Sequence, residues 1–307
     1  MMKYEIFKDV VVEKFMNFLP DEMQGRYELC VRKVTKVNTE LDAISLNDRE
    51  ETYSVSPTLY INDMYKEYCQ SEDLDAVLDK AAFMMVSHMK KAKRINLDFD
   101  TARENIIFQL INTENNCELL KNVPHRQFND LSFIYRWVVD TKGDELGSII
   151  VTNELAENLQ LTEEELYELA SENTCRLLPA TITPMNEVIR KLMASDGMPE
   201  EMIEAMLPEI PEENGLWVIG NKQGVNGAVS MLYDGLLANL ADKLGSDLYV
   251  LPSSIHETIA VSSNNFKPEE LFTMVKEINE TQVMPEDKLT DNVYFYDREA
   301  RTLTATA

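Results

Sequence analysis

The sequence predicts an α+β fold, with mixed sheets and helices that form two lobes. Helical periodicities and strand-like alternations are mixed along the 307 residues without a repeating β-α-β unit. Hydrophobic residues make up 44% of the chain and charged residues 27%, which is typical of a globular protein with a sizeable core. We therefore expect an N-terminal α+β lobe of residues 1–98 and a larger mixed α+β lobe of residues 99–307.

The N-terminal lobe is predicted to consist of a helix, a β-hairpin and two further helices, in residues 1–20, 28–48 and 56–93. The first segment mixes charged and apolar residues, which indicates an amphipathic helix and neither a signal peptide nor a membrane anchor. The second segment alternates in two runs, which predicts the hairpin. In the third, apolar residues from Leu74 to Met89 recur at helical spacing, and Ser71 or Asp73 is expected to cap that helix.

The larger lobe is predicted to mix strands and helices around a central sheet. Residues 106–153 are rich in β-branched and aromatic side chains, which are typical of strands. Thr162 and Glu165 stand at the spacing of a capping box and predict the start of a helix. The predicted elements are, in order, strands 106–112, 128–140 and 146–153 with a turn at 141–145, a helix in 161–173, a strand and a helix in 179–193, strands 216–220 and 227–232 joined by a hairpin loop, a helix in 234–245, strands 247–252 and 256–263, a helix in 267–280 and a hairpin in 293–305.

An acidic stretch interrupts this lobe near residues 195–215. It contains Asp196, six glutamates and three prolines, which is typical of a linker or a mobile excursion. We expect a mobile segment there.

Acidic residues dominate the charge balance, with 54 Asp and Glu against 29 Lys and Arg and a formal net charge of −25. Phosphate contacts need clustered Lys and Arg, so this balance opposes ordinary nucleic-acid binding. The nearest approach to a basic patch, Lys90 to Arg94, lies at the end of a predicted helix, where cations interact favourably with the helix dipole. The same charge leaves open an acidic mimic of nucleic acid, whose carboxylates would occupy a DNA-binding protein.

The cysteines and histidines indicate neither a metal site nor a cofactor. Cys30, Cys69, Cys117 and Cys175 lie far apart, without the close pairing of zinc sites or redox motifs. We interpret them as reduced thiols, which predicts a cytoplasmic location. No H-E-x-x-H or H-x-H motif occurs, and no run reaches 18 apolar residues, so we expect no metal and no membrane span.

The segment from His125 to Arg136 is the first candidate ligand site. His125, Arg126 and Asp130 gather at the entry of a predicted strand, in an otherwise hydrophobic stretch. Arg126 with His125 suits a carboxylate or phosphate group. The alternative, which we favour, is that these groups satisfy loop carbonyls and pair with nearby acids.

Arg176 and His256 complete the candidate ligand-binding residues. Arg176 lies near a predicted helix end, where it can donate to the last carbonyls or to a buried acid. His256 follows Ser253 and Ser254, which suggests a hydrolase, but no G-x-S-x-G motif or oxyanion loop accompanies them. We therefore interpret this segment as a polar strand entry. His88 lies on the predicted apolar face of a helix and is interpreted as a half-buried histidine with no ligand role.

Several segments of the sequence resemble those of a known family. They are SPTLYINDMYKEY, VPHRQFNDLSFIYRWVV, ENTCRLLPATI, KLGSDLYVLPSSIHE and INETQVMPEDKLTDNVYFYDRE. Over its whole length the chain resembles an uncharacterised bacterial family, domain of unknown function 5688, and more distantly the YtpQ-like proteins. The resemblance implies a shared fold and a bacterial cytosolic setting, and it assigns no activity, cofactor or catalytic residue.

These observations favour a non-enzymatic cytosolic protein that binds a protein or a small molecule, because each candidate site has a structural interpretation. The first alternative is an enzyme that binds a small anion in a polar pocket around His125 and Arg126, joined by Asp130, Arg176 and His256 if the fold brings them together. The acidic mimic is the second alternative.

Overall fold

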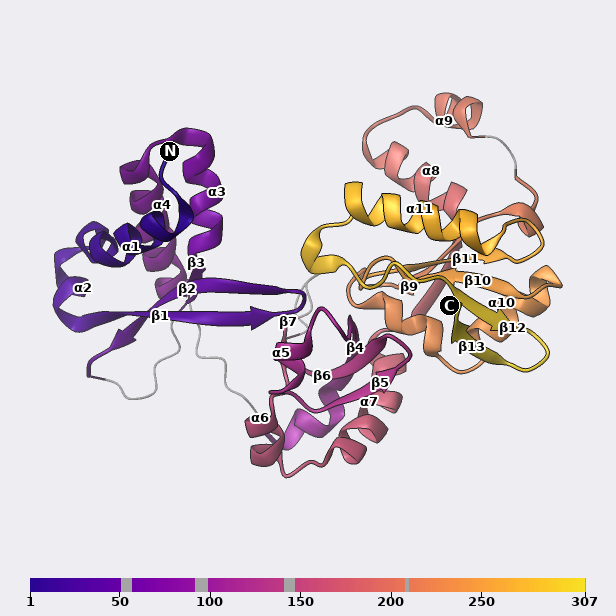
Figure 1. Cartoon of the computed structure of the whole chain (residues 1–307), viewed down its shortest axis with the longest axis horizontal. Helices are drawn as coiled ribbons and strands as arrows, with labels where there is room; N and C mark the ends of the chain where they lie inside the picture. Colours follow the sequence, from indigo (N-terminus) through magenta and orange to yellow (C-terminus); the bar gives the residue numbers. More distant parts are fainter. Residues whose placement is uncertain (51–56, 92–98, 141–146, 208–209, 307) are drawn as a thin grey trace. The chain divides into compact units, whose positions relative to one another are not determined.

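The protein has an α+β fold, seen in a computed structural model that describes residues 1–50, 57–91, 99–140, 147–207 and 210–306 (Figure 1). In these residues, helices accompany three sheets whose strand pairs are antiparallel. Contacts within the chain define two compact units, unit 1 (Met1–Leu97) and unit 2 (Asp98–Ala307). The predicted lobe boundary, between residues 98 and 99, adjoins the segment 92–98, which lies outside the described residues. The two-lobe organisation stays a prediction.

Unit 1 contains a three-stranded sheet in the order β1-β2-β3. Its elements are α1 (Tyr4–Lys14), η1 (Phe15–Phe18), α2 (Asp21–Arg26), β1 (Tyr27–Lys36), β2 (Thr39–Asp48), β3 (Leu59–Tyr60), α3 (Ile61–Ser71) and α4 (Leu74–Lys91). Strands β1 and β2 pair along their full length, which confirms the predicted hairpin. Asn38 takes a left-handed φ of 59° in the turn, which asparagine tolerates better than most residues. Asp73 caps α4, since its carboxylate accepts a hydrogen bond from the Ala76 N–H.

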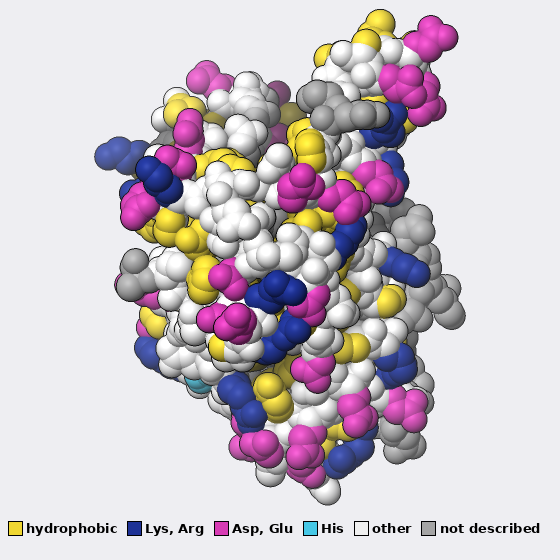
Figure 2. All heavy atoms as spheres, turned by 90° about the vertical axis from the view of Figure 1, so that its right-hand side faces the viewer, with side chains coloured by type: hydrophobic (Ala, Val, Ile, Leu, Met, Phe, Trp, Pro, Cys, Tyr) yellow, Lys and Arg dark blue, Asp and Glu magenta, His cyan; other side chains and the backbone are white. Residues whose placement is uncertain are grey.

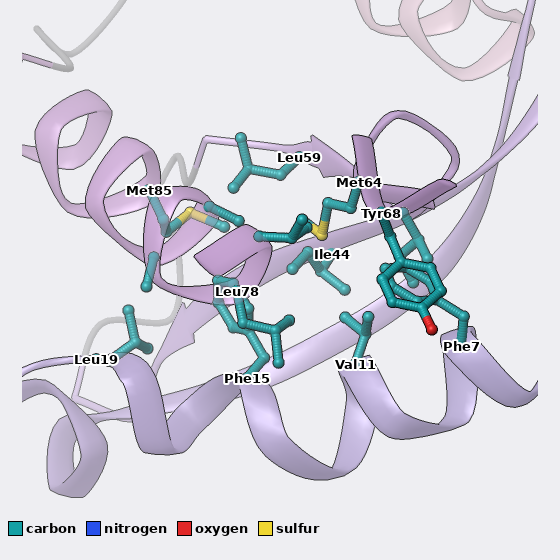
Figure 3. Packing of buried hydrophobic residues seen from close by; sticks show 14 of the residues in the cluster. Phe7, Val11, Phe15, Leu19, Ile44, Leu59, Met64, Tyr68, Leu78 and Met85 are labelled. Atoms are coloured by element: carbon teal, nitrogen blue, oxygen red, sulfur yellow. The ribbon is translucent and has the colours of Figure 1, made fainter. Parts of the chain in front are cut away.

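The core of unit 1 joins its helices to one face of the sheet (Figure 3). Phe15 and Ile44 are fully buried in it, and Phe7 stacks on Tyr68 with ring centroids 5.2 Å apart. The predicted apolar face of α4 is only partly correct. Its residues Leu78 and Met85 are buried, but Met84 is exposed. His88 is exposed as well, so the half-buried position that we predicted for it is wrong.

Unit 2 contains two sheets. One has the strand order β4-β6-β5, with β7 also paired to β6, and the other has the order β13-β12-β10-β11-β9-β8. The strands are β4 (Ile106–Asn112), β5 (His125–Phe128), β6 (Leu131–Asp140), β7 (Gly147–Ile150), β8 (Ala180–Pro184), β9 (Trp217–Asn221), β10 (Leu248–Leu251), β11 (Thr258–Ser262), β12 (Tyr294–Asp297) and β13 (Thr302–Ala305).

Helices precede and connect the strands of unit 2. They are η2 (Phe99–Asn105), α5 (Cys117–Leu120), α6 (Asn153–Leu159), α7 (Glu163–Leu177), α8 (Met185–Ser195), α9 (Glu200–Met206), η3 (Glu212–Asn214), η4 (Gly227–Leu232), α10 (Leu236–Leu244), α11 (Pro268–Thr281) and η5 (Pro285–Asp287). Thr162 and Glu165 form the predicted capping box at the start of α7. Helix α7 packs on β4, and the Thr174 hydroxyl accepts a hydrogen bond from the Phe108 N–H. This bond ties the helix to the edge of the sheet.

Three predicted elements of unit 2 differ from the structure. The predicted strand 128–140 is broken at Asn129, whose φ of 53° turns the chain between β5 and β6. Residues 227–232 form η4, so both the strand predicted there and the hairpin loop before it are wrong. Helix α9 and η3 lie within the acidic stretch 195–215, of which residues 208–209 are outside the described residues. The predicted turn 141–145 also lies outside them.

Candidate functional site

Arg126 lies on β5 and faces the start of α7. Its guanidinium donates to Glu163 through Nε at 3.1 Å and Nη2 at 2.8 Å, and to the Glu164 carboxylate at 2.6 Å. The guanidinium carbon lies 3.8 Å from the centroid of the Tyr167 ring, a cation–π contact. The candidate anion-binding arginine is therefore paired with two carboxylates and stacked on an aromatic ring.

Glu163 is the centre of this cluster, because Tyr135 also donates to it, at 2.5 Å. Burial acts to raise the pKa of Glu163, but the hydrogen bonds from Arg126 and Tyr135 outweigh it and lower that pKa. Burial, reinforced by the hydrogen bond to the Glu163 carboxylate, raises the pKa of Tyr135. The cluster thus consists of an ionised acid, a cation and a neutral phenol that satisfy one another.

The other two candidates on this hairpin have separate surroundings. The His125 side chain is exposed, and its Nδ1 lies 3.1 Å from the Val123 carbonyl oxygen. Asp130 accepts hydrogen bonds from Thr290 at 2.5 Å, from Asn292 at 3.0 Å and from the Tyr294 hydroxyl. Asp130 therefore joins the β5–β6 turn to the segment before β12.

Arg176 lies in the last turn of α7 and holds η2 in place. Its guanidinium donates to the carbonyl oxygen of Glu104 and to the Asn173 side chain at 2.8 Å. The sequence suggested the last carbonyls of its own helix or a buried acid as partners, whereas the observed partners are a carbonyl of a different helix and an amide side chain.

His256 precedes β11 and is held through both ring nitrogens. The Asn226 N–H donates to Nδ1 at 3.3 Å, so Nε2 carries the proton that is donated to Asp287 at 3.1 Å. The Ser254 hydroxyl accepts from the His256 backbone N–H at 3.1 Å. With both nitrogens engaged, this imidazole is not positioned as a base for a serine nucleophile.

A polar cavity of 370 Å³ lies beside Asp130, and the sequence did not point to it. Its lining includes Asn112 after β4, Asn279 on α11 and the segment from Lys288 to Asn292. Of the five candidate residues, Asp130 lines this cavity, and the other four are not among its lining residues in the described parts of the chain. The segment KLTDN, residues 288–292, could have indicated this cavity, since it gathers polar residues directly before a strand.

A second cavity, of 270 Å³, is lined in part by aromatic rings, among them Phe108, Phe133 and Tyr167. Cys175 and Asp234 also line it. Burial raises the pKa of the Cys175 thiol, and the nearby Asp234 acts in the same direction. A protonated thiol is a weak nucleophile, so this environment opposes thiol catalysis.

The fold and these sites define an acidic α+β protein in which four of the five candidate residues, Arg126, Asp130, Arg176 and His256, make side-chain hydrogen bonds to other side chains. A model described as "Family of unknown function (DUF5688)" matches residues 4–298, nearly the whole chain. The chain belongs to this family. No curated protein and no solved structure matches it.

Two further findings concern membranes and metals. In the described part of the chain, none of the helices is both long and apolar enough to cross a bilayer. Among the same residues, His, Cys, Asp and Glu side chains do not gather in groups of three or more that could hold a metal ion.

Replacing Arg126 with alanine is expected to destabilise unit 2 by about 1 to 2 kcal/mol, a modest value because its side chain is 31% exposed. The depressed pKa of Glu163 adds stability that is fully present above the ordinary glutamate pKa of about 4.3. This stability is lost as the pH falls through the pKa of Glu163 in the folded protein, because Glu163 is then protonated in both the wild type and the Arg126→Ala variant. Urea unfolding should therefore show a penalty for Arg126→Ala that is largest near neutrality and shrinks on acidification.

Lys121→Ala is the matched control, because it removes an exposed ion pair with Glu118 in the same unit. We expect its unfolding curve to follow that of the wild type. A penalty for Arg126→Ala that does not change with pH would contradict the assigned role of Glu163.

Proposed function

We propose that this protein is a non-enzymatic binding protein whose α8–α9 surface docks a basic amphipathic helix of a partner protein. The observation that carries the proposal is a set of exposed apolar side chains on two packed helices, flanked by carboxylates. We define the α8–α9 surface by Leu192 on α8 and by Met202 and Met206 on α9.

The α8–α9 surface exposes side chains that a helix normally buries. Leu192 is 60% exposed, and Met202 and Met206 are 53% and 56% exposed. Met202 and Met206 are one turn apart and share a face of α9, while Ile203 between them is buried. Helix α9 is therefore anchored through one side chain and presents its methionines outward. Methionine adapts to differently shaped apolar partners.

The charges around this surface select the kind of partner. Helices α8 and α9 and the turn between them carry five carboxylates, against the two cations Arg190 and Lys191. Lys191 is paired with Glu187 at 2.7 Å and Arg190 with Glu200 at 3.6 Å, so the cations are already matched. A surplus of three negative charges remains. An apolar face with an acidic rim complements a helix that is apolar on one side and basic on the other.

Figure 2 shows this combination at its upper end, where α9 projects and hydrophobic and acidic side chains lie side by side. Over the rest of that face, Asp and Glu side chains are interspersed with Lys and Arg. An acidic mimic of nucleic acid would need carboxylates in ordered rows, so this mixture favours a local docking surface.

The enzymatic alternative has less support. An anion at Arg126 would have to displace Glu163 and Glu164, which together accept three hydrogen bonds from the guanidinium.

The cytoplasmic bacterial setting belongs to our proposal as well. It is supported by the free thiols at Cys30, Cys69, Cys117 and Cys175.

Binding of labelled model peptides tests the proposal. We use two peptides of about four helical turns with the same leucine face, one with lysine and one with glutamate on the polar face. Fluorescence anisotropy should show binding of the lysine peptide only. The double substitution Met202→Gln and Met206→Gln should weaken it at least tenfold, about 1.4 kcal/mol, because it removes the apolar contact without changing charge.

Met284→Gln is the matched control, because Met284 is 56% exposed, as Met206 is, but lies outside the α8–α9 surface. We expect it to bind the lysine peptide as the wild type does. Equal binding of both peptides, or an equal loss in the Met284 variant, would overturn the proposal.

A further inference from the structure

The second cavity of unit 2, of 270 Å³, has a wall of three packed aromatic rings, and we call it the aromatic cavity. Phe108 on β4 and Phe133 on β6 have ring centroids 4.8 Å apart. The Tyr167 ring of α7 lies beside both of them, with centroids 5.2 Å from Phe108 and 6.0 Å from Phe133. Because these rings pack on one another, the wall that they form is in place before any ligand arrives and suits a flat apolar group.

The hydroxyl groups that line the aromatic cavity are engaged by the protein itself. Ser171 and Thr174 each donate to the carbonyl oxygen of the residue one turn earlier in α7. The Tyr233 hydroxyl donates to the Leu178 carbonyl oxygen at 3.0 Å. The protons of these hydroxyls are therefore already used, and the walls offer a ligand apolar contact more than hydrogen-bond donors.

The charge of the aromatic cavity comes from Asp234. Among the described residues that line the cavity, it is the one with a charged side chain, and it is exposed. Its carboxylate has no ion-pair partner in the described part of the chain. Asp234 also lies close enough to the Cys175 thiol to help raise the pKa of that thiol. An accessible, unpaired carboxylate beside an apolar wall attracts a cation and repels an anion.

We propose that the aromatic cavity binds a monocyclic aromatic amine, whose ring lies against the three packed rings and whose ammonium group faces Asp234. An apolar cavity of about 150 Å³ is enough to bind benzene. The volume of 270 Å³ therefore holds one ring together with a short side chain. Contact between aromatic rings adds to the gain from apolar burial, while the carboxylate selects the charge at the other end of the ligand.

Calorimetric titration with 2-phenylethylamine tests the class of ligand, beside two analogues that each lack one part of it. The analogue 2-phenylethanol keeps the ring without the charge, and ethylamine keeps the charge without the ring. We expect 2-phenylethylamine to bind saturably, 2-phenylethanol to bind about threefold more weakly, and ethylamine to bind more weakly by about tenfold or more. The charge contributes less than the ring, because water screens an exposed ion pair. No binding of 2-phenylethylamine, or equal binding of either analogue, would overturn the assignment.

Alkylation of Cys175 locates the bound amine. Cys175 is exposed and lines the aromatic cavity, whereas Cys117, which is also exposed, is not among the described residues that line it. In saturating 2-phenylethylamine, N-ethylmaleimide should modify Cys175 several-fold more slowly and Cys117 at its usual rate, as measured by peptide mass spectrometry. An unchanged rate at Cys175, or equal slowing of both thiols, would place the amine elsewhere and overturn the assignment.

Asp234→Asn tests the role of the carboxylate. This substitution removes the charge with almost no change in volume, and the fold should persist because the side chain is exposed. Affinity for 2-phenylethylamine should fall about threefold, to that of 2-phenylethanol, while affinity for 2-phenylethanol stays the same. Asp9→Asn is the matched control, because it removes an exposed carboxylate from unit 1, and it should bind the amine as the wild type does. An Asp234→Asn protein that still prefers the amine would contradict the proposal.

This inference is independent of the α8–α9 surface. The variant with glutamine at positions 202 and 206 should lose peptide binding and keep amine binding, and Asp234→Asn should do the reverse. Each proposal can therefore fail alone.

Discussion

Replacing Phe15 with alanine is expected to destabilise unit 1 by about 3 to 5 kcal/mol, the usual cost of removing a buried phenylalanine. Phe15 is fully buried in the unit 1 core, and the close-packed side chains around it refill the cavity left behind only in part. Hydrogen exchange with mass spectrometry should show a loss of protection confined to unit 1. The same protection as in the wild type is expected across unit 2.

Phe83→Ala is the control, since Phe83 belongs to the same unit but is 75% exposed. It should leave hydrogen exchange nearly unchanged. If Phe15→Ala instead lowered protection equally in both units, the two units would unfold together and the proposed division into two lobes would be wrong.

Gly227→Ala is expected to cost about 3 kcal/mol or more, although it adds a single methyl group. A Cβ at this position would lie 2.3 Å from the His256 carbonyl oxygen and 3.0 Å from the Asn221 nitrogen. Both are backbone atoms, so the clash can be relieved only if the start of η4 or the segment around His256 moves. Thermal melting should show the loss, and hydrogen exchange should place it around β9 and η4.

Gly25→Ala provides the contrast. Gly25 lies in α2, and a Cβ there meets no atom within 4 Å. This variant should gain about 0.5 to 1 kcal/mol, because alanine is the better helix former. A Gly227→Ala protein as stable as the wild type would show that the contact between η4 and the His256 segment is looser than described.

Local signals predicted the elements that depend on neighbours in the chain. Thr162 and Glu165 are three residues apart and cap α7 as their spacing indicates, and β1 and β2 alternate and pair as expected. The strand prediction for residues 227–232 failed because their composition suits a strand, whereas in the fold they form a 3₁₀ helix whose first residue, Gly227, lies close to the His256 backbone. That contact joins segments about 30 residues apart, and no local pattern contains it.

The candidate sites depend even more on contacts between residues that are distant in the chain, which local sequence patterns do not contain. The sequence identified Arg126 as a polar residue in a hydrophobic stretch, but its partner Glu163 lies 37 residues further along. Asp130 accepts a hydrogen bond from Tyr294, which lies 164 residues further along the chain. The aromatic cavity was missed altogether, because the residues that line it come from β4, β6, α7 and the segment around Tyr233. Pairings at such distances depend on the tertiary fold.

The six-stranded sheet joins strands that are distant in the chain, and this arrangement bears on the order in which the protein folds. Thr258 on β11 pairs with Ile219 on β9, and Leu248 on β10 pairs with Tyr296 on β12. The β1–β2 hairpin pairs neighbouring residues instead, and local pairings form faster than distant ones. During synthesis β9, β10 and β11 can pair with one another before β12 is made, but one edge of β10 stays open until β12 follows. An open strand edge can pair with another chain, so we expect aggregation to be most favoured in this interval.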